Sequence, residues 1–283
     1  MSKSIKFLSW IGSGIGKPPG WERVVRMFVS PEKCRGIGEL CMVRDGVVFQ
    51  AQPWVPIGWH VALFGTYEPE LRAIFQAVLP TGGVALDIGA NVGWHTLLMA
   101  SLVGDDGRVL AAEANPSVRV HLHNNLKLNR FGQVEVIPYA IADAEGTVEF
   151  YGPDADDADS GNGHVVTDGV ERERGIIRVE TRRLDTIVYT TQIERLDLIK
   201  IDVEGFEWPV LQGGENTIVK FRPHIIFEYD AAYSSRGKGD LRAMAEFFRT
   251  HRYRLFAIGR TWAEAVDLEN WPDCANIWAT PVS

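Results

Sequence analysis

The chain has few cysteines, no long apolar run and no excess of positive charge. Its 283 residues include only Cys34, Cys41 and Cys274, without the paired spacing of a zinc site or a redox motif. So sparse and odd a number is typical of reduced thiols in a cytosolic protein and argues against a disulfide framework. We therefore expect a cytoplasmic protein.

Two classes of partner are excluded on similar grounds. No apolar stretch reaches the ~18 residues of a membrane span, and Met1–Trp10 lacks the apolar core of a signal peptide. The formal net charge is −8, whereas duplex binding relies on many Lys and Arg contacts to phosphate. We predict no membrane span and no nucleic-acid partner. The sequence does not indicate an oligomeric state.

Two stretches resemble binding loops without meeting their requirements. Gly12, Gly14 and Gly16 precede Lys17, but a phosphate loop ends in Gly-Lys-Ser or Gly-Lys-Thr after a strand, so we predict a turn-rich segment. The stretch 152–175 is rich in Asp and Gly and lacks the alternating ligands of a calcium loop, so we interpret it as a solvated, lid-like insertion. Its clustered acids are Asp154, Asp156, Asp157 and Asp159.

Most of the chain alternates between strand and helix patterns. Apolar periodicity predicts strands at 84–88, 108–112, 134–138, 196–203, 225–229, 253–258 and 275–280, and helices at 70–79, 93–102, 117–128, 208–212 and 241–250. Such alternation indicates βαβ units and an α/β fold with a largely parallel sheet. We predict an N-terminal extension with one or two hairpins (1–64) and a main domain (65–283) interrupted by β arms at 147–181.

The most informative segment is the turn after the first of these strands. Asp87, Gly89, Asn91 and Gly93 occupy alternate positions there, and the two glycines permit a tight turn into a helix. Asn91 replaces the second glycine of the dinucleotide motif, so a pyrophosphate fits poorly. A carboxylate at Asp87 instead suits a cationic ligand such as S-adenosylmethionine (SAM), which carries a sulfonium and an ammonium.

A second acid supports this interpretation. Glu113 follows the strand 108–112, about 20 residues after the glycine turn, where a carboxylate can accept both ribose hydroxyls. Alone it is equally explained as a surface acid before a helix, where the dipole favours it. Together with the glycine turn it predicts a nucleoside site.

The sequence resembles the FkbM family of class I SAM-dependent methyltransferases from about residue 65 to 281. The resemblance rests on 65–70 (GTYEPE), 87–93 (DIGANVG), 124–129 (NNLKLN), 179–185 (VETRRLD) and 198–205 (LIKIDVEG). Ala114 is a departure, since the family usually has proline there. The resemblance implies a Rossmann-like, mostly parallel seven-stranded sheet with helices on both faces, and methyl transfer to oxygen, in many relatives on sugar or polyketide hydroxyls.

Cofactor-binding residues follow from this resemblance position by position. Asp87, Gly89, Asn91 and Gly93 would line the methionine moiety of SAM and Glu113 its ribose. Ala140 and Asp143 would lie near the adenine, and Glu68 would reach the cofactor from the N-terminal side. His95, in the first turn of the glycine-loop helix, is a further candidate for lining the cofactor or acceptor.

Three acids are the catalytic candidates. A hydroxyl must lose its proton during attack, which requires a base or a metal. Asp202, Glu204 and Glu228 follow two neighbouring strands at their carboxyl ends, where open α/β sheets bind ligands. Strand alternation puts Lys200, Asp202 and Glu204 on one side if the strand extends that far, so that Lys200 pairs with a carboxylate. In the simpler reading, Asp202 merely caps the next helix. The choice of base stays open, and so does a divalent metal.

The predicted function is therefore SAM-dependent O-methylation of a small molecule or glycan. One alternative is a nucleic-acid 2′-O-methyltransferase, which would need a lysine in the helix after Asp202 and a different net charge. Another is a non-catalytic SAM-binding protein, against which the three acids argue.

Overall fold

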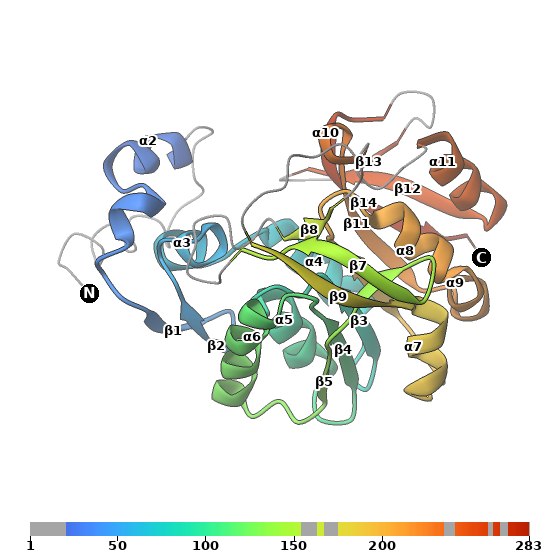
Figure 1. Ribbon diagram of the computed structural model, residues 1–283, viewed down its shortest axis with the longest axis horizontal. Coiled ribbons are helices and arrows are strands. Elements are labelled where there is room, and N and C mark those ends of the chain that lie inside the picture. The colour runs from blue at the N-terminus through green and yellow to red at the C-terminus, as the bar shows by residue number, and fades with distance from the viewer. Residues whose placement is uncertain are drawn as a thin grey trace.

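The main body of the molecule is an eight-stranded sheet. The computed structural model describes residues 21–153, 163–166, 175–234, 241–259, 263–266 and 271–282. The strand order is β13-β12-β14-β11-β10-β3-β4-β5. Figure 1 shows β12 and β14 toward one end of this sheet and β4 and β5 at the other. The strands are β3 (Val84–Ile88), β4 (Arg108–Ala112), β5 (Val134–Ile137), β10 (Leu198–Ile201), β11 (His224–Asp230), β12 (Tyr253–Ile258), β13 (Ala263–Ala265) and β14 (Cys274–Pro281).

Five neighbouring strands are parallel, and the two strands β14 and β13 run in the opposite direction. β5, β4, β3, β10 and β11 pair in parallel, whereas β14 lies antiparallel between β11 and β12. Along the chain, β4 and β5 are added on one side of β3. The later strands β10 and β11 are added on its other side. The strand order therefore switches between β3 and β10, which is where an open α/β sheet forms its ligand crevice.

Helices cover both faces of this sheet. The helices of the main body are α4 (Pro69–Val78), α5 (Trp94–Val103), α6 (Pro116–Asn129), α7 (Leu184–Thr190), α8 (Glu207–Gly213), α9 (Glu215–Phe221), α10 (Ala231–Ser234) and α11 (Leu241–Thr250). Buried side chains of α4, α5 and α6 join one apolar cluster with Ala85 and Ile226. Those of α7, α8, α9 and α11 join another with Leu86 and Ile225.

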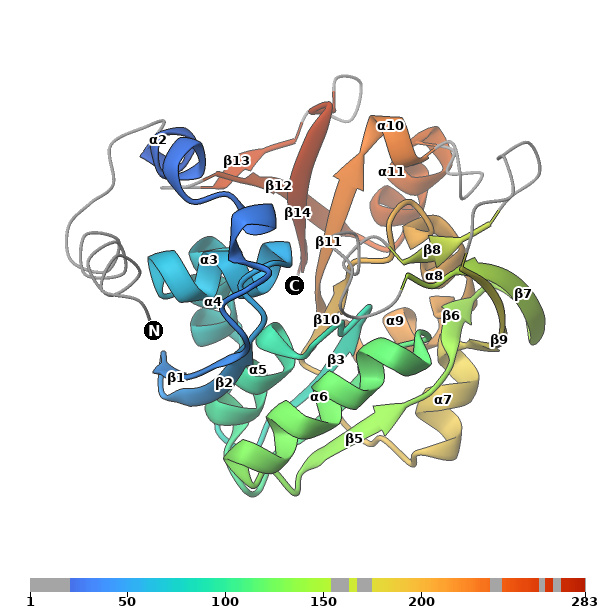
Figure 2. The same ribbon diagram turned by 60° about the vertical axis from the view of Figure 1, so that its left-hand side comes forward.

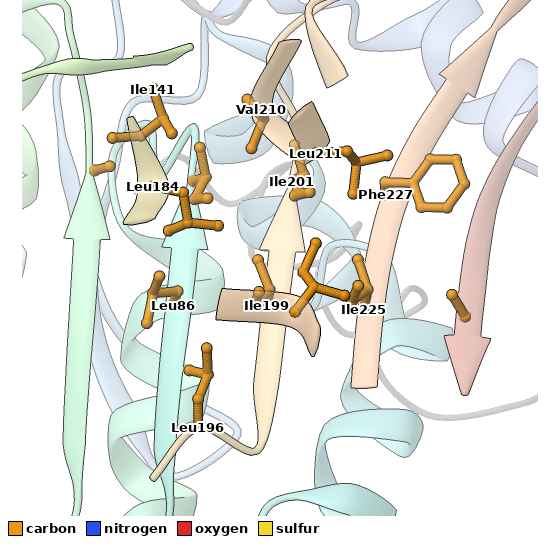
Figure 3. Close-up of a cluster of buried hydrophobic side chains, with 14 of the residues drawn as sticks. Leu86, Ile141, Leu184, Leu196, Ile199, Ile201, Val210, Leu211, Ile225 and Phe227 are labelled. Carbon is orange, nitrogen blue, oxygen red and sulfur yellow. The ribbon is translucent and has the colours of Figure 1, made fainter. Parts of the chain in front are cut away.

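Strand alternation produces these two clusters. Successive residues of a strand point to opposite faces, so Leu86 and Ile88 pack on one side while Ala85 packs on the other. Figure 3 shows the first cluster, in which Ile199 and Ile201 of β10 lie beside Ile225 and Phe227 of β11. Because both faces are buried, the central strands are almost wholly apolar, and a charged residue within them is an exception.

A smaller four-stranded sheet lies beside the main one. It has the order β6-β9-β7-β8 and consists of β6 (Ala140–Ala142), β7 (Gly146–Tyr151), β8 (His164–Val165) and β9 (Ile176–Arg183). In Figure 2 it stands at the right, beyond β5 and α6. The predicted β arms are thus present, whereas residues 154–162 and 167–174, with the clustered aspartates of the predicted lid, lie outside the described residues.

The N-terminal segment packs on the helices of one face. It comprises α2 (Trp21–Phe28), the 3₁₀ turn η1 (Pro31–Cys34), the hairpin β1–β2 (Leu40–Arg44 and Val47–Ala51) and α3 (Pro56–Phe64). Val47, Phe49 and Ala51 are fully buried in the cluster that contains α5. The glycine-rich stretch before Lys17 lies outside the described residues.

Two asparagines of α6 fasten this hairpin to the main body. Asn129 Oδ1 accepts from the N–H of Val48 at 2.7 Å and its Nδ2 donates to the carbonyl of Val48 at 2.7 Å, as a partner strand would. Asn125 Oδ1 accepts from Gln50 N at 2.8 Å, and its Nδ2 donates to Val92 O at 2.9 Å. The edge of β2 that does not pair with β1 is thereby hydrogen-bonded to side chains of α6.

The class of fold is as predicted, with differences in detail. The main sheet has eight described strands where seven were predicted, because three residues, Ala263–Ala265, add an edge strand to β12. The segment 56–64 is a helix where a second hairpin was possible, and Pro56 at its first turn suits that start. Within the described part of the chain, no helix is both long and apolar enough to span a membrane.

Candidate active site

A cavity opens at the carboxyl ends of β3 and β10, on either side of the switch in strand order. Its wall includes the glycine turn after β3, the end of β4, the turn after β10, and Glu228 of β11. Val55 and Ile57 line it from the N-terminal segment, Tyr67 from the stretch before α4, and Phe150 and Val165 from the small sheet. Segments far apart in the sequence, from Val55 to Glu228, thus meet around one cavity.

The glycine turn owes its shape to packing against the neighbouring turn. Gly89, Asn91 and Gly93 have φ values of 80°, 51° and 92°, a region that favours glycine and tolerates asparagine. A Cβ at Gly89 would lie 1.8 Å from the carbonyl oxygen of Asp202, and one at Gly93 2.5 Å from Leu122 Cδ1. The glycines therefore bring β3, β10 and α6 together. Gly89 and Asn91 line the cavity, whereas Gly93 is not one of its described lining residues.

Glu113 connects the glycine turn to the end of β4. Its Oε2 accepts from Asn91 N at 2.9 Å and its Oε1 from Asn115 N at 2.7 Å. Only 8% of the residue is exposed, and burial raises the pKa of its carboxyl group while the two backbone hydrogen bonds oppose this. Glu113 lines the cavity, and each carboxylate oxygen can accept a further hydrogen bond besides the one it already accepts.

Asp87 lies beneath the cavity. The residue is fully buried, and its Oδ2 accepts a hydrogen bond of 2.6 Å from Thr96 Oγ1. Its Oδ1 lies 3.7 Å from Lys200 Nζ, and burial raises the pKa of its carboxyl group. Asp87 does not line the cavity wall. Lys200, the ion-pair partner of Asp87, does line the cavity.

Lys200 and three acids form the most polar part of the wall. Lys200 Nζ donates to Asp202 Oδ2 at 3.1 Å, and one carboxylate oxygen from each of Asp202, Glu204 and Glu228 lies within 4.8 Å of the others. The negative charge of Asp202, and then burial, raises the pKa of Glu228 to about 9. We call Asp202, Glu204 and Glu228 the acid triad.

The three acids of the triad lie close together although β10 ends before Asp202. The strand stops at Ile201, and a turn with positive φ at Glu204 (54°) and Gly205 (97°) follows. Glu207 holds this turn, because its Oε1 accepts from Val203 N at 3.3 Å and Gly205 N at 3.1 Å. The pairing of Lys200 with a carboxylate is confirmed, but turn geometry rather than strand alternation places Glu204.

Glu68, Tyr67 and His95 adjoin the acid triad. Glu68 Oε1 accepts from Asn276 Nδ2 at 2.9 Å, and burial together with the charge of Asp202 raises the pKa of Glu68 to about 7. Burial, and then the charge of Lys200, lowers the pKa of His95 well below its usual value, so its imidazole is neutral. Burial and the nearby acids raise the pKa of Tyr67. Tyr67 and His95 line the cavity.

The opposite end of the cavity is apolar. Tyr139, Ala140 and Ile141 line it, together with Phe150 and Val165. Asn115 connects this end of the cavity to the segment that follows β7, because its Nδ2 donates to Pro153 O at 2.9 Å. Asp143, also predicted near the adenine, is exposed and lies outside this cavity, where its carbonyl accepts from Arg183.

Sequence patterns alone did not identify several of the lining residues. Val55, Ile57 and Phe150 are apolar residues in segments without a ligand motif. Tyr67 is adjacent to Glu68 in the family-like stretch 65–70, and that adjacency was the available signal. Chemically, the acid triad offers oxygen donors of the kind that divalent cations such as Mg²⁺ prefer, and equally a proton acceptor beside a hydrophobic wall.

Comparison with known proteins gives a consistent result. The family model for the methyltransferase FkbM domain matches residues 87–255. The chain is 33% identical over 187 residues to the 2-O-methyltransferase NoeI of Sinorhizobium fredii, covering 62% of this chain and 74% of NoeI. It is 26% identical over 181 residues to the hexuronic acid methyltransferase AglP of Haloferax volcanii, covering 62% of this chain and 70% of AglP.

A longer relative and a solved structure are also similar. The AMB antimetabolite synthetase AmbE of Pseudomonas aeruginosa is 27% identical over 225 residues, 68% of this chain, which span only 10% of AmbE's length. The crystal structure of a methyltransferase FkbM from Methylobacillus flagellatus matches with a TM-score of 0.46 and 15% identity, covering 78% of this chain and 52% of that one.

Proposed function

Because the chain belongs to the FkbM methyltransferase family, we propose that it transfers the methyl group of SAM to a hydroxyl group of a small molecule or glycan. The observation that supports this proposal best is the acid triad beside a cavity that also contains Glu113 and the glycine turn. One cavity thus has an end suited to a nucleoside and an end suited to accepting a proton.

The residues present fit SAM. Glu113 offers carboxylate lone pairs to a ribose, and Tyr139, Ala140 and Ile141 offer an apolar slot to a base. Acids at the other end complement a sulfonium and an ammonium. When bound, SAM supplies an electrophilic methyl group for in-line attack.

Among the acid triad, Asp202 is our first choice as the general base. Lys200 orients its carboxylate through the contact of 3.1 Å. Glu228 has a pKa raised to about 9, so it carries a proton near neutral pH and donates hydrogen bonds rather than accepting a proton. Glu204 is an alternative base, and Glu228 would be one only after losing its proton. A divalent metal held by the triad would be a further way to lower the pKa of the hydroxyl.

The names of two relatives support the type of acceptor. NoeI is described as a 2-O-methyltransferase and AglP as a hexuronic acid methyltransferase, which favours oxygen as the methylated atom and a sugar-like acceptor. A nucleic-acid acceptor is not favoured, because the net charge of −8 opposes binding to phosphate. The three unbonded cysteines support a reducing compartment such as the cytoplasm.

Calorimetry followed by an acceptor screen tests the proposal. We expect SAM and S-adenosylhomocysteine to bind and NAD not to bind. Glu113→Ala should weaken SAM binding by about 1–3 kcal/mol, the scale of a lost charged hydrogen bond. Glu246→Ala is the matched control, since Glu246 is exposed and paired with Arg249 on α11. Unchanged SAM affinity in Glu113→Ala would contradict the assignment of this cavity.

A further inference from the structure

The charges of the cavity wall are strongly one-sided. Its described lining residues include four acids, Glu113, Asp202, Glu204 and Glu228, of which Glu228 holds a proton near neutral pH, and only one lysine or arginine, Lys200. We infer that the methyl acceptor is an uncharged or amino-bearing polyol, and that the cavity rejects acceptors with a carboxylate near the reacting hydroxyl. This inference rests on the proposed function and narrows its substrate class.

Lys200, the single lysine or arginine of the described lining, is already paired with carboxylates. Lys200 Nζ lies 3.1 Å from Asp202 Oδ2 and 3.7 Å from Asp87 Oδ1, and its side chain is only 4% exposed. His95 lies in the same wall but is neutral, since burial and Lys200 both oppose its protonation. No described lining residue therefore offers a free positive charge to the carboxylate of an acceptor.

The acids also repel one another. One carboxylate oxygen from each of Asp202, Glu204 and Glu228 lies within 4.8 Å of the others. A further negative charge placed beside them is therefore costly. An acceptor carboxylate brought within ~6 Å would meet the same repulsion, which at an effective dielectric constant of about 20 corresponds to a 10- to 100-fold loss.

The same wall suits a neutral polyol. Carboxylates accept hydrogen bonds from several hydroxyl groups at once, and an amino group would add charge attraction. Val55, Ile57 and the ring of Tyr67 provide an apolar surface in the same cavity, as the less polar face of a sugar ring requires. AglP is named for a hexuronic acid, so this chain should differ from that relative in the charge of its acceptor.

A balanced acceptor panel tests the inference. Matched glucosides, glucosaminides and glucuronides, each with the same aglycones, would be assayed for formation of S-adenosylhomocysteine, with chelator and with Mg²⁺. We expect kcat/KM for glucuronides to be at least about tenfold lower than for their neutral or amino partners. Equal or preferred turnover of glucuronides, including turnover that appears only with Mg²⁺, would overturn it. Methyl transfer to no panel member, with SAM bound, would instead remove the proposed function, and this inference with it.

A change of charge within the wall provides a second measurement. Ile57→Lys introduces a cation into the lining, and Ile57→Gln is a control of similar length without charge. The ratio of kcat/KM for glucuronide over glucoside should rise about tenfold in Ile57→Lys relative to Ile57→Gln. An identical ratio in the two variants would contradict electrostatic selection at this wall.

Discussion

Asn276 donates a hydrogen bond of 2.9 Å from its Nδ2 to Oε1 of Glu68, a residue 208 positions earlier in the chain. Asn276 also lies opposite Glu228 in the antiparallel pair β11–β14. The last strand of the sheet thus connects an acid before α4 with one member of the acid triad. That strand runs against its parallel neighbours and still takes part in the site.

Replacing this donor should create a pH-dependent defect. In Asn276→Asp a carboxylate would face Glu68, whose pKa is raised to about 7. At pH 8 both groups are ionised, so we expect unfolding by urea to require about 1–3 kcal/mol less free energy. At pH 5 Glu68 is protonated and can donate to the new carboxylate, so most of the loss should disappear. An equal loss at both pH values would rule out this explanation.

Replacing the carboxyl group of Glu228 with an amide should stabilise the protein at alkaline pH. Its folded pKa is raised to about 9 from an ordinary 4.5, so between these values the folded state holds a proton that the unfolded chain has released. Stability contributed through this group therefore falls as pH rises through that range. Glu228→Gln should exceed the parent protein by about 1–3 kcal/mol at pH 8.

The comparison at low pH provides the control. Near pH 4 Glu228 is protonated in both states, so Glu228→Gln and the parent should then unfold at similar urea concentrations. Glu68 and Glu207 are present in both proteins, and their contributions cancel. A difference in stability that does not depend on pH would mean that packing, not charge, distinguishes Glu228→Gln from the parent protein.

The glycine at position 89 should be irreplaceable for steric reasons. Gly89→Ala would place a methyl group 1.8 Å from the carbonyl oxygen of Asp202, whereas Gly82→Ala, at a similar φ of 75°, meets nothing within 4 Å. Both variants pay the cost of a positive φ, about 1–2 kcal/mol. We expect Gly82→Ala to fold with that loss and Gly89→Ala to lose several kcal/mol more or to fail to fold. Similar melting temperatures would contradict the close approach of the two turns.

Asp202 should matter for turnover rather than for SAM affinity. If it is the general base, Asp202→Asn should lower kcat by about 10²–10⁴, the usual range for such catalysis. Glu204→Gln and Glu228→Gln are the comparison variants, each assayed with and without chelator. Loss of activity on chelation with recovery on adding Mg²⁺ would identify a metal role for the triad. Full activity in all three variants under both conditions would mean that positioning alone drives the reaction.

Local sequence patterns predicted the centre of the fold well. Residues 84–88 and 108–112 are strands with the predicted bounds, since short apolar runs between turn residues suit a sheet buried on both faces. The turn with Gly89 and Gly93, and the acids after β10, were found in the same way. These features depend on neighbours in the chain, which a sequence displays directly.

Features that depend on distant residues were not predicted. The contact of Asn276 with Glu68 has no local signal, and the burial of Asp87 beneath Lys200 depends on the register of β3 against β10. The edge strand β13 is three exposed residues, too short and too polar for a periodic pattern. The roles predicted for the individual site residues remain predictions.

The amide of Asn125 bears on how relatives of this protein can be recombined. One side chain serves both the backbone of the N-terminal hairpin, at Gln50, and the turn that follows β3, at Val92. A chimera that imports the N-terminal segment of another protein would therefore need a matching amide on α6, or one buried polar group would lose its partner. Grafts should keep the hairpin and the α6 asparagines from the same parent. The N-terminal segment and α6 are therefore one unit of exchange.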